Sequence, residues 1–290
     1  MEAKYHYTKI IVLGSGKLAH QCAVEGKKRL EKVEVLEYKV TDSTVLQKLC
    51  EKDGLFYLCC DKEELRKRLS HETEKALVVS AGNTWLVPRE IVKKSNLMII
   101  NWHNALLPRH RGRNAEAWSI YQGDVETGIT WHLLTEGVDT GDIIAQEKIP
   151  VDDTVTALKL FQRQCNLGIQ MFQRILGPLL LDQCEFCRQE EMSEEQLHFS
   201  YEIPNEGWLD TAWSYEEISR FLRAMDYGVL KLLGEMRVRW QGDVYTFCKY
   251  RITEAEMAEG IDLQDNDMVI VREGHKIILK SLKKEGDNQQ

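Results

Sequence analysis

The segment 101–108, with the sequence NWHNALLP, carries residue types that can perform acid–base chemistry. It follows the apolar run 97–102, which predicts a buried strand. Asn101 and His103 are two residues apart, so their side chains at a strand end point to the same side. An amide can donate a hydrogen bond to an oxyanion while an imidazole moves a proton. From these residues alone, the alternative is a turn-capping Asn101 and a loop His103 with an internal partner.

A carboxylate follows in the turn 137–141, whose sequence is GVDTG. Flanking glycines favour a tight turn, and such a turn can return Asp139 to the crevice beside Asn101 and His103. A carboxylate raises the pKa of a neighbouring imidazole and fixes its orientation. The sequence therefore predicts a catalytic triad of Asn101, His103 and Asp139, if the fold brings the turn back to the strand end.

Positive charge gathers directly after this segment, in the sequence RHRGR at 109–113. Guanidinium groups match the geometry of phosphate oxygens. We therefore expect Arg109, Arg111 and Arg113 to bind the phosphates of a substrate, with a solvated loop as the alternative.

A Gly-Ser-Gly turn at 14–16 separates the predicted strand 9–13 from a predicted helix at 17–30. Backbone N–H groups at a helix start can hold a phosphate, so Gly14, Gly16 and Lys17 are candidate substrate contacts. Ala19 stands where the dinucleotide motif has its third glycine, and Glu34 and Glu37 are available for a ribose. A nicotinamide-binding protein and a plain tight turn thus remain alternatives.

Strand-like and helix-like segments alternate through the first half of the chain. Strand patterns cover 9–13, 33–40, 55–60, 76–81 and 97–102, and helical patterns cover 17–30, 44–51 and 88–94. This alternation predicts βαβ units and an α/β fold with a Rossmann-like, mostly parallel sheet. Such sheets bind ligands at the carboxyl ends of their strands, where Asn101 and His103 would lie.

The second half has a different texture. Strand patterns at 128–134 and 143–149 precede an amphipathic helix at 156–176, and the polar stretch after it reads as a linker. Ser214 and Glu217 form a capping box that opens a helix, and β-rich runs follow it. We expect a catalytic domain at 1–187, a linker at 188–205 and a smaller β-rich, barrel-like domain at 206–290.

Composition excludes several classes of protein. The chain has 38 basic and 46 acidic residues, a net charge of -8, which disfavours broad binding to nucleic acid. No apolar run approaches the ~18 residues of a membrane span, and the short N-terminal run does not fit a secretory signal, so we expect a cytoplasmic protein. Cys184 and Cys187 form one CxxC without a second pair, which favours free thiols over a metal site.

Three motifs together resemble one family: NWHNALLP at 101–108, TGIT at 127–130 and DTG at 139–141. Their order and spacing are similar to those of the 10-formyltetrahydrofolate-dependent formyltransferases over about residues 9–180. That family includes methionyl-tRNA, glycinamide ribonucleotide and sugar-nucleotide formyltransferases. The resemblance implies that Asn101, His103 and Asp139 are catalytic and that 10-formyltetrahydrofolate is the co-substrate.

The resemblance also implies a mechanism and a cofactor site. An acceptor amine would attack the formyl carbon while Asn101 and protonated His103 hold the oxyanion and Asp139 keeps the imidazole charged. The pterin would lie against two loops, at Thr84, Trp85, Leu86 and Val87 in the first and at Leu134, Gly137, Val138 and Asp139 in the second. Trp85 offers an apolar wall or belongs to the ordinary core.

The acceptor is inferred from the C-terminal part. Segment 208–225 resembles the start of the C-terminal domain of the tRNA and sugar-nucleotide enzymes, but residues 201–290 contain 12 basic and 17 acidic residues, a poor surface for tRNA. Asn104 and Ala105 also stand where the tRNA enzymes have Pro and Ser. We expect the acceptor to be a small phosphorylated amine, above all a nucleotide-linked amino sugar. A homodimer is one possible assembly of the protein. A methionyl-tRNA formyltransferase and a formyltetrahydrofolate hydrolase are the alternatives.

Overall fold

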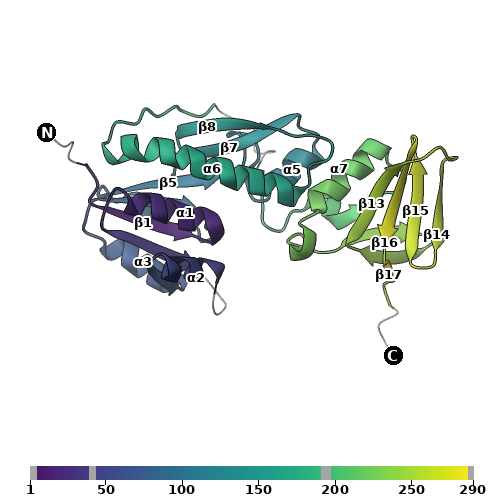
Figure 1. Cartoon of the computed structure of the whole chain (residues 1–290), viewed down its shortest axis with the longest axis horizontal. Helices are drawn as coiled ribbons and strands as arrows, with labels where there is room; N and C mark the ends of the chain where they lie inside the picture. Colours follow the sequence, from purple (N-terminus) through teal and green to yellow (C-terminus); the bar gives the residue numbers. More distant parts are fainter. Residues whose placement is uncertain (1–4, 39–43, 191–196, 287–290) are drawn as a thin grey trace. The chain divides into compact units, whose positions relative to one another are not determined.

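A seven-stranded sheet organises the first half of the chain in this computed structural model, which describes residues 5–38, 44–190 and 197–286 (Figure 1). Its strand order is β3-β2-β1-β4-β5-β7-β8. The strands are β1 (Lys9–Gly14), β2 (Val33–Tyr38), β3 (Phe56–Cys60), β4 (Ala76–Ala81), β5 (Leu97–His103), β7 (Glu126–Leu133) and β8 (Ile143–Pro150). The first five strands in this order, β3, β2, β1, β4 and β5, pair in parallel, and β7 pairs antiparallel with β5. The predicted Rossmann-like, mostly parallel sheet is therefore confirmed.

Helices cover both faces of this sheet. They are α1 (Gly16–Lys27), α2 (Val45–Lys52), α3 (Lys62–His71), α4 (Arg89–Val92) and α6 (Ala157–Leu180). Helices α1 and α6 share one face, since Gln173 of α6 donates to Glu25 of α1 over 2.9 Å. Helices α3 and α4 bury Leu65, Leu69 and Ile91 against the other face. No helix among the described residues is long and apolar enough to cross a membrane.

Local sequence signals account for most of these boundaries. The Thr44 hydroxyl accepts the Gln47 N–H at the start of α2, and the Asp61 carboxylate accepts the Glu64 N–H at the start of α3. The predicted strands at 76–81 and 97–102 match β4 and β5 to within one residue. The last two positions of the predicted strand 33–40 lie outside the described residues.

Helix α6 packs closely on the sheet at Gly168. A Cβ at this position would lie 2.5 Å from Nε1 of Trp102, which is closer than real atoms pack. The indole of Trp131 in β7 donates a hydrogen bond to the carbonyl of the same glycine over 3.1 Å. Because Trp102 lies between Asn101 and His103 on β5, this contact helps to set where both side chains stand.

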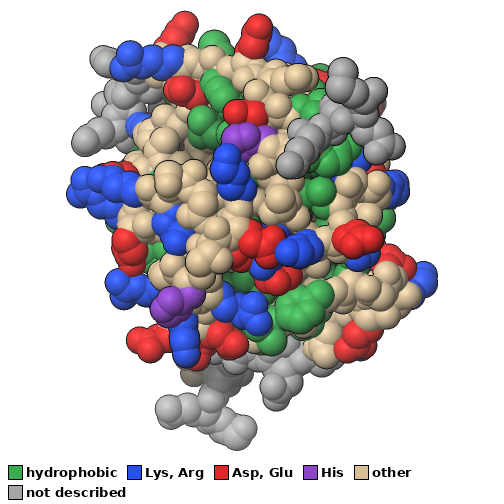
Figure 2. Space-filling view, turned by 90° about the vertical axis from the view of Figure 1, so that its left-hand side faces the viewer, with side chains coloured by type: hydrophobic (Ala, Val, Ile, Leu, Met, Phe, Trp, Pro, Cys, Tyr) green, Lys and Arg blue, Asp and Glu red, His purple; other side chains and the backbone are tan. Residues whose placement is uncertain are grey.

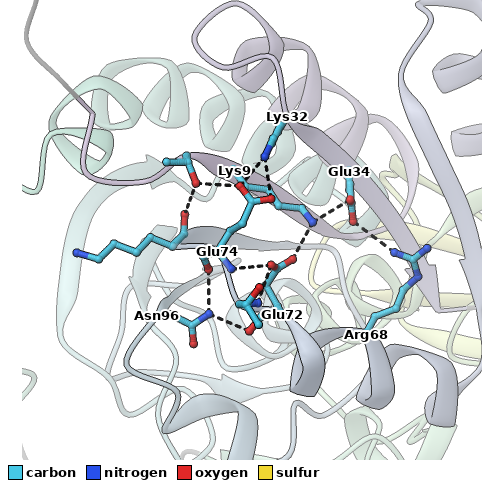
Figure 3. A network of polar contacts seen from close by, with 10 residues as sticks. Lys9, Lys32, Glu34, Arg68, Glu72, Glu74 and Asn96 are labelled. Atoms are coloured by element: carbon cyan, nitrogen blue, oxygen red, sulfur yellow. Dashed lines mark hydrogen bonds and ion pairs between the residues drawn. The ribbon is translucent and has the colours of Figure 1, made fainter.

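A polar network joins the strands at the end opposite Asn101 and His103 (Figure 3). Lys9 at the start of β1 lies 2.8 Å from a Glu34 oxygen and 2.7 Å from a Glu72 oxygen. Burial lowers the pKa of Lys9, but the hydrogen bonds with Glu34 and Glu72 outweigh it and leave that pKa raised. Asn96, just before β5, donates to the carbonyls of Glu72 and Glu74. The network therefore aligns the amino ends of β1, β2, β4 and β5.

The chain forms two compact units, each described by itself. The first consists of Met1–Arg111, Gly128–Ile149 and Arg163–Gln196, and the second of Gly112–Thr127, Pro150–Gln162 and Leu197–Gln290. The second unit thus contains two short pieces of the predicted catalytic region. The domain division at residues 187 and 206 stays a prediction.

The second unit is rich in β-structure, as predicted. One sheet has the order β10-β11-β12-β17 and another the order β13-β16-β15-β14. Their bounds are β10 (Trp208–Leu209), β11 (Met236–Trp240), β12 (Asp243–Phe247), β13 (Lys249–Glu254), β14 (Gly260–Gln264), β15 (Asp267–Arg272), β16 (His275–Lys280) and β17 (Lys283–Lys284). The remaining elements are β6 (Arg111–Gly112), α5 (Ala115–Tyr121), β9 (Leu197–His198), η2 (Pro204–Gly207), α7 (Tyr215–Met225) and η3 (Gly228–Leu230).

Helix α7 ties the pieces of the second unit together. It begins with the predicted capping box, in which the side chains of Ser214 and Glu217 are both engaged. Its buried Arg223 donates to the Val155 carbonyl over 3.2 Å, and the Tyr227 hydroxyl just after the helix donates to Glu116 over 2.6 Å. These bonds explain why 112–127 and 150–162 belong with the C-terminal sheets.

We predict that Gly168→Ala destabilises the protein although alanine favours helix. The added methyl group must push against Trp102, and overpacking of this kind costs roughly 1–3 kcal/mol. The free energy of unfolding in urea measures the loss. Gly177→Ala in the same helix is the matched control, because a Cβ there meets open space. Pro178 follows it directly in the helix, so a small effect of the control on stability is expected from this neighbour. Equal stability of both variants would contradict the prediction.

Candidate active site

The carboxyl end of β5 brings the three predicted catalytic residues together. The Asp139 carboxylate lies 3.4 Å from Nδ1 of His103 through one oxygen. Through its other oxygen it accepts a 3.4 Å hydrogen bond from the Asn101 amide. The turn 137–141 therefore returns to the strand end, as the sequence argument required. The catalytic role of the three groups stays a prediction.

The His103 ring is buried, with 4% of its surface exposed. Its Nε2 atom lies 2.8 Å from the carbonyl oxygen of His110. Because a carbonyl oxygen can only accept, Nε2 must carry the hydrogen in this contact. Nδ1 is then the basic atom of the neutral ring, and it faces Asp139.

Burial dominates the protonation of His103. Burial lowers the pKa of His103, the negative charge of Asp139 raises it, and the resulting pKa lies below the ordinary value of 6.5. The sequence led us to expect an imidazole that Asp139 keeps charged. In this structure the loss of hydration outweighs the single carboxylate, which favours the neutral ring, and a neutral ring can accept a proton.

His132 is a member of the site that the sequence argument missed. It lies opposite Asn101 in the β5–β7 pairing, and its Nε2 accepts a 3.1 Å hydrogen bond from the Asn101 amide. Its Nδ1 donates to the Leu133 carbonyl over 2.8 Å. Nε2 also lies 3.4 Å from an Asp139 oxygen. In the sequence, His132 is two residues after Thr130 on a predicted strand, so the two side chains share one face. Only the strand pairing shows that His132 lies opposite Asn101.

The Asp139 loop is closely packed against β7. Asp139 has a φ of 52°, in the left-handed region that costs energy for a residue with a Cβ. A Cβ at Gly141 would lie 1.8 Å from the Leu133 carbonyl oxygen, so this position requires glycine. The Thr135 and Thr140 hydroxyls share a 2.8 Å hydrogen bond across the loop. These contacts hold the loop in its strained conformation and so keep the Asp139 carboxylate in place.

The first predicted cofactor loop is closed by Asn83. The Asn83 side chain accepts the N–H of Trp85 and donates to its carbonyl, so the polar backbone groups of Trp85 have partners within the loop. The Trp85 ring is buried in the core beside α3 and α4, with Val87 packed against the same cluster. Leu86 is 81% exposed and is the apolar side chain of this loop that a ligand can reach. The Thr84 side chain is exposed.

The second predicted cofactor loop is tied to the first by charge. Glu136 forms ion pairs with Lys93 over 2.7 Å and with Arg89 over 2.9 Å, both in or beside α4. The hydrogen bond from Lys93 lowers the pKa of Glu136. Within this loop, Leu134 packs on the core, Val138 is 43% exposed and Gly137 lies against Thr140. Charge therefore links the second loop, which carries Asp139, to the helix that follows the first loop.

The arginine cluster is divided by the fold. Arg109 and Arg111 flank His110, whose carbonyl binds the His103 ring, so both start from the edge of the site. Both are half-buried, and Nε of Arg111 is buried with no hydrogen-bond partner among the described residues. Arg113 is exposed and belongs to the second compact unit. Its N–H donates to the His198 carbonyl.

The Gly-Ser-Gly turn has a structural reason of its own. A Cβ at Gly14 would lie 1.9 Å from the Ala81 carbonyl oxygen, so glycine lets β1 end against β4. Gly16 has a φ of 65°, and the Lys17 amine donates to Asn166 over 3.4 Å. Phosphate binding at these residues stays a prediction.

The acid that a dinucleotide would need is occupied. Glu37 at the end of β2 is buried, and one of its oxygens accepts hydrogen bonds from the Thr44 and Tyr57 hydroxyls. A ribose would have to share this buried carboxylate with both hydroxyls. This arrangement argues against the nicotinamide alternative.

Cysteines and metal-binding groups add no further centre in the residues that the structure describes. Cys184 is half-buried and Cys187 is exposed, and both are free thiols. Within those ranges, no group of three or more His, Cys, Asp and Glu side chains is arranged to hold a metal ion.

Comparison with known families identifies the chain. Residues 9–176 match the family model described as formyl transferase. The match covers more than half of the chain and includes all three residues of the triad. The protein belongs to the formyl transferase family.

Two curated relatives carry different acceptors in their names. GDP-perosamine N-formyltransferase of Brucella melitensis is 35% identical over 176 residues, which are 58% of this chain and 66% of that protein. The matched part thus spans slightly less than two thirds of that relative. Methionyl-tRNA formyltransferase of Bacillus thuringiensis is 27% identical over 253 residues, which are 83% of this chain and 76% of that protein.

A solved structure shares the fold over nearly the whole chain. The N-formyltransferase of Helicobacter canadensis, solved with folinic acid and dTDP-3-aminofucose, superposes with a TM-score of 0.74. It is 20% identical and covers 94% of this chain and 98% of its own. The formyltransferase fold therefore extends through the C-terminal sheets.

We predict that Asp139→Asn lowers the pKa of His103 further. The substitution removes the nearby negative charge that raises this pKa, while the burial that lowers it remains. Titration of the histidine ring signals by NMR measures the shift, with the His103 signal assigned through His103→Gln. An unchanged or higher pKa in the variant would show that the 3.4 Å contact carries no electrostatic coupling.

Proposed function

We propose that this protein is an N-formyltransferase that moves the formyl group of 10-formyltetrahydrofolate to the amine of a small phosphorylated acceptor, a nucleotide-linked amino sugar. The observation that carries the proposal is the assembled triad in a member of the formyl transferase family. Asn101 and His103 each lie 3.4 Å from a carboxylate oxygen of Asp139 at the carboxyl end of β5. The Brucella relative supports a sugar-nucleotide acceptor through its name.

The triad supplies each group that amide formation needs. Nδ1 of the neutral His103 ring accepts the proton that the acceptor nitrogen loses as the new C–N bond forms. Asp139 then lies 3.4 Å from a positive imidazole and stabilises it. The His110 carbonyl keeps the ring in place through Nε2. His103 then gives this proton to the folate nitrogen as the bond between that nitrogen and the formyl carbon breaks, so charge and atoms balance.

Asn101 stabilises the negative oxygen in this proposal. Its amide holds His132 at 3.1 Å and Asp139 at 3.4 Å. The longer bond is the weaker one, so a substrate oxygen can replace it while His132 keeps the amide oriented. A preorganised donor of this kind contributes roughly 10²–10³ in rate where it has been removed by mutation.

The two loops beside the triad fit a folate. When bound, 10-formyltetrahydrofolate supplies the formyl group. Exposed Leu86 and Val138 offer apolar contacts for a flat ring, and the Glu136 ion pairs link the second loop to α4, which follows the first loop. The side chain of Trp85 contributes to the core beneath them rather than to the surface. Thr84, Val87, Leu134 and Gly137 would hold the ring through backbone groups.

Surface charge favours a small acceptor over tRNA. On the face that Figure 2 shows, Lys and Arg side chains are interspersed with Asp and Glu rather than gathered into one basic field. Residues 201–290 are net acidic by count. The match to a methionyl-tRNA enzyme over 83% of the chain keeps that activity as the second candidate. We also propose that the protein is cytoplasmic and forms a homodimer. Light scattering measures the molar mass and so tests the homodimer.

We predict that His103→Ala and Asp139→Asn each lower turnover by about 10²-fold or more. The first removes the proton acceptor and the second removes the charge that stabilises its protonated form. Formyl transfer at saturating co-substrate measures the loss, and circular dichroism checks folding. Turnover near that of the wild type would remove the residue from the mechanism.

Mass spectrometry of the acceptor tests the function directly. Candidate amines are incubated with 10-formyltetrahydrofolate, and a formylated product gains about 28 Da. We expect nucleotide-linked amino sugars to react. Charged initiator tRNA serves as the comparison, and efficient formylation of that tRNA at physiological salt would overturn the proposed acceptor. Release of formate without any acceptor would instead indicate a hydrolase.

We predict that Arg111→Ala raises the KM for the acceptor about tenfold and leaves the KM for the folate unchanged. The buried Nε without a partner and the position beside His110 make Arg111 the better phosphate ligand of the cluster. Arg109→Ala and Arg113→Ala complete the series. Arg251→Ala, an exposed arginine of β13, is the control for loss of charge alone. Equal effects of Arg111→Ala and Arg251→Ala would refute a specific phosphate contact.

A further inference from the structure

The segment that follows α6 runs alongside the Asp139 loop. Cys187 and Ile143 form an antiparallel bridge, with N–H to O distances of 2.7 and 2.8 Å in the two directions. Ile143 begins β8, directly after the loop. The bridge therefore anchors residues 187–189 beside the catalytic carboxylate, in a stretch that the sequence marks only as the start of a polar linker.

Gln189 reaches from this segment into the loop. Its Nε2 atom donates to the Asp139 carbonyl over 2.9 Å and to the Gly141 carbonyl over 2.6 Å. One amide group thus uses both of its hydrogens on the two carbonyls that flank Thr140. Gln189 is half-buried, and its partners are about fifty positions earlier in the chain.

The Asp139 loop needs such a restraint. Its backbone at Asp139 has a φ of 52°, which costs energy for a residue with a side chain. On one side the loop is held by the Leu133 N–H, which donates to the Asp142 carbonyl over 2.8 Å. The Gln189 amide holds the other part, at the residue whose carboxylate faces Asn101 and His103.

We propose that Gln189 is a positioning residue: its amide fixes the backbone on both sides of Thr140 and so keeps the Asp139 carboxylate beside the catalytic groups. The contacts of the carboxylate are 3.4 Å long, so a small movement of the backbone would lose them. A displacement of about 1 Å at a catalytic group can cost 10²-fold in rate. The inference deepens the proposed function and rests on it.

Gln189→Met tests the proposal because methionine keeps the length of the side chain and removes both donors. We expect kcat to fall about 10-fold or more, with the KM of the acceptor within twofold of the wild type. Gln189→Glu, which places acceptors against two carbonyls, should be at least as impaired. Gln183→Ala, an exposed glutamine of the same segment, is the matched control and should keep the wild-type kcat.

A double-mutant cycle separates positioning from general stability. If Gln189 acts through the Asp139 carboxylate, Gln189→Met should have little further effect on kcat in the Asp139→Asn background. The proposal is overturned if the two losses simply multiply, or if Gln189→Met alone keeps kcat within twofold of the wild type. Thermal unfolding of each variant shows whether it is folded during the assay.

A readout without any substrate keeps this test independent of the proposed function. A displaced Asp139 carboxylate no longer raises the pKa of His103, which also faces His110 and His132. In Gln189→Met, the NMR titration of His103 should therefore move to lower pH, toward the value in Asp139→Asn. A His103 titration identical to that of the wild type in a folded Gln189→Met would refute the positioning role. If the titration shifts but no acceptor is ever formylated, the proposed function fails and the positioning of Asp139 stands.

Discussion

The antiparallel pairing of β7 with β5 is the constraint on which the site depends. It places His132 opposite Asn101 and Thr130 opposite His103, and it starts the Asp139 loop beside the same strand. A register shift by one residue would turn each of these side chains to the other face of the sheet. A Cβ at Gly168 of α6 would clash with Trp102 in the middle of this pairing, so the helix packs closely on the strand that carries Asn101 and His103.

Within that frame, the removal of water decides the protonation of His103. The ring loses nearly all contact with solvent, and one carboxylate at 3.4 Å does not restore what hydration gave the charged form. Burial thus favours a neutral imidazole, and the negative charge of Asp139 lies next to it. This arrangement suits a reaction in which the imidazole takes a proton from an amine. The same geometry makes the position of Asp139 critical, and Glu136 and Gln189 restrain its loop from two sides.

Most of the fold follows from patterns a few residues long. Strand β4 and the capping box of α7 lie where the sequence predicts them, because alternation, capping and turn chemistry act between near neighbours. The antiparallel direction of β7 could not be read in this way, since it depends on how the chain returns after α5. The inclusion of 112–127 and 150–162 in the second unit likewise rests on distant contacts of Arg223 and Tyr227.

For the site, the sequence alone determined the residue types, their order and their spacing: Asn101 and His103 on one side of a strand end, and Asp139 in a turn that glycines permit. The tertiary structure decided the rest. It supplied His132 and Gln189, which meet the triad from strand pairing and from a segment fifty positions away. It also set the direction of the His103 pKa, because burial is a property of the folded surroundings and not of any local pattern.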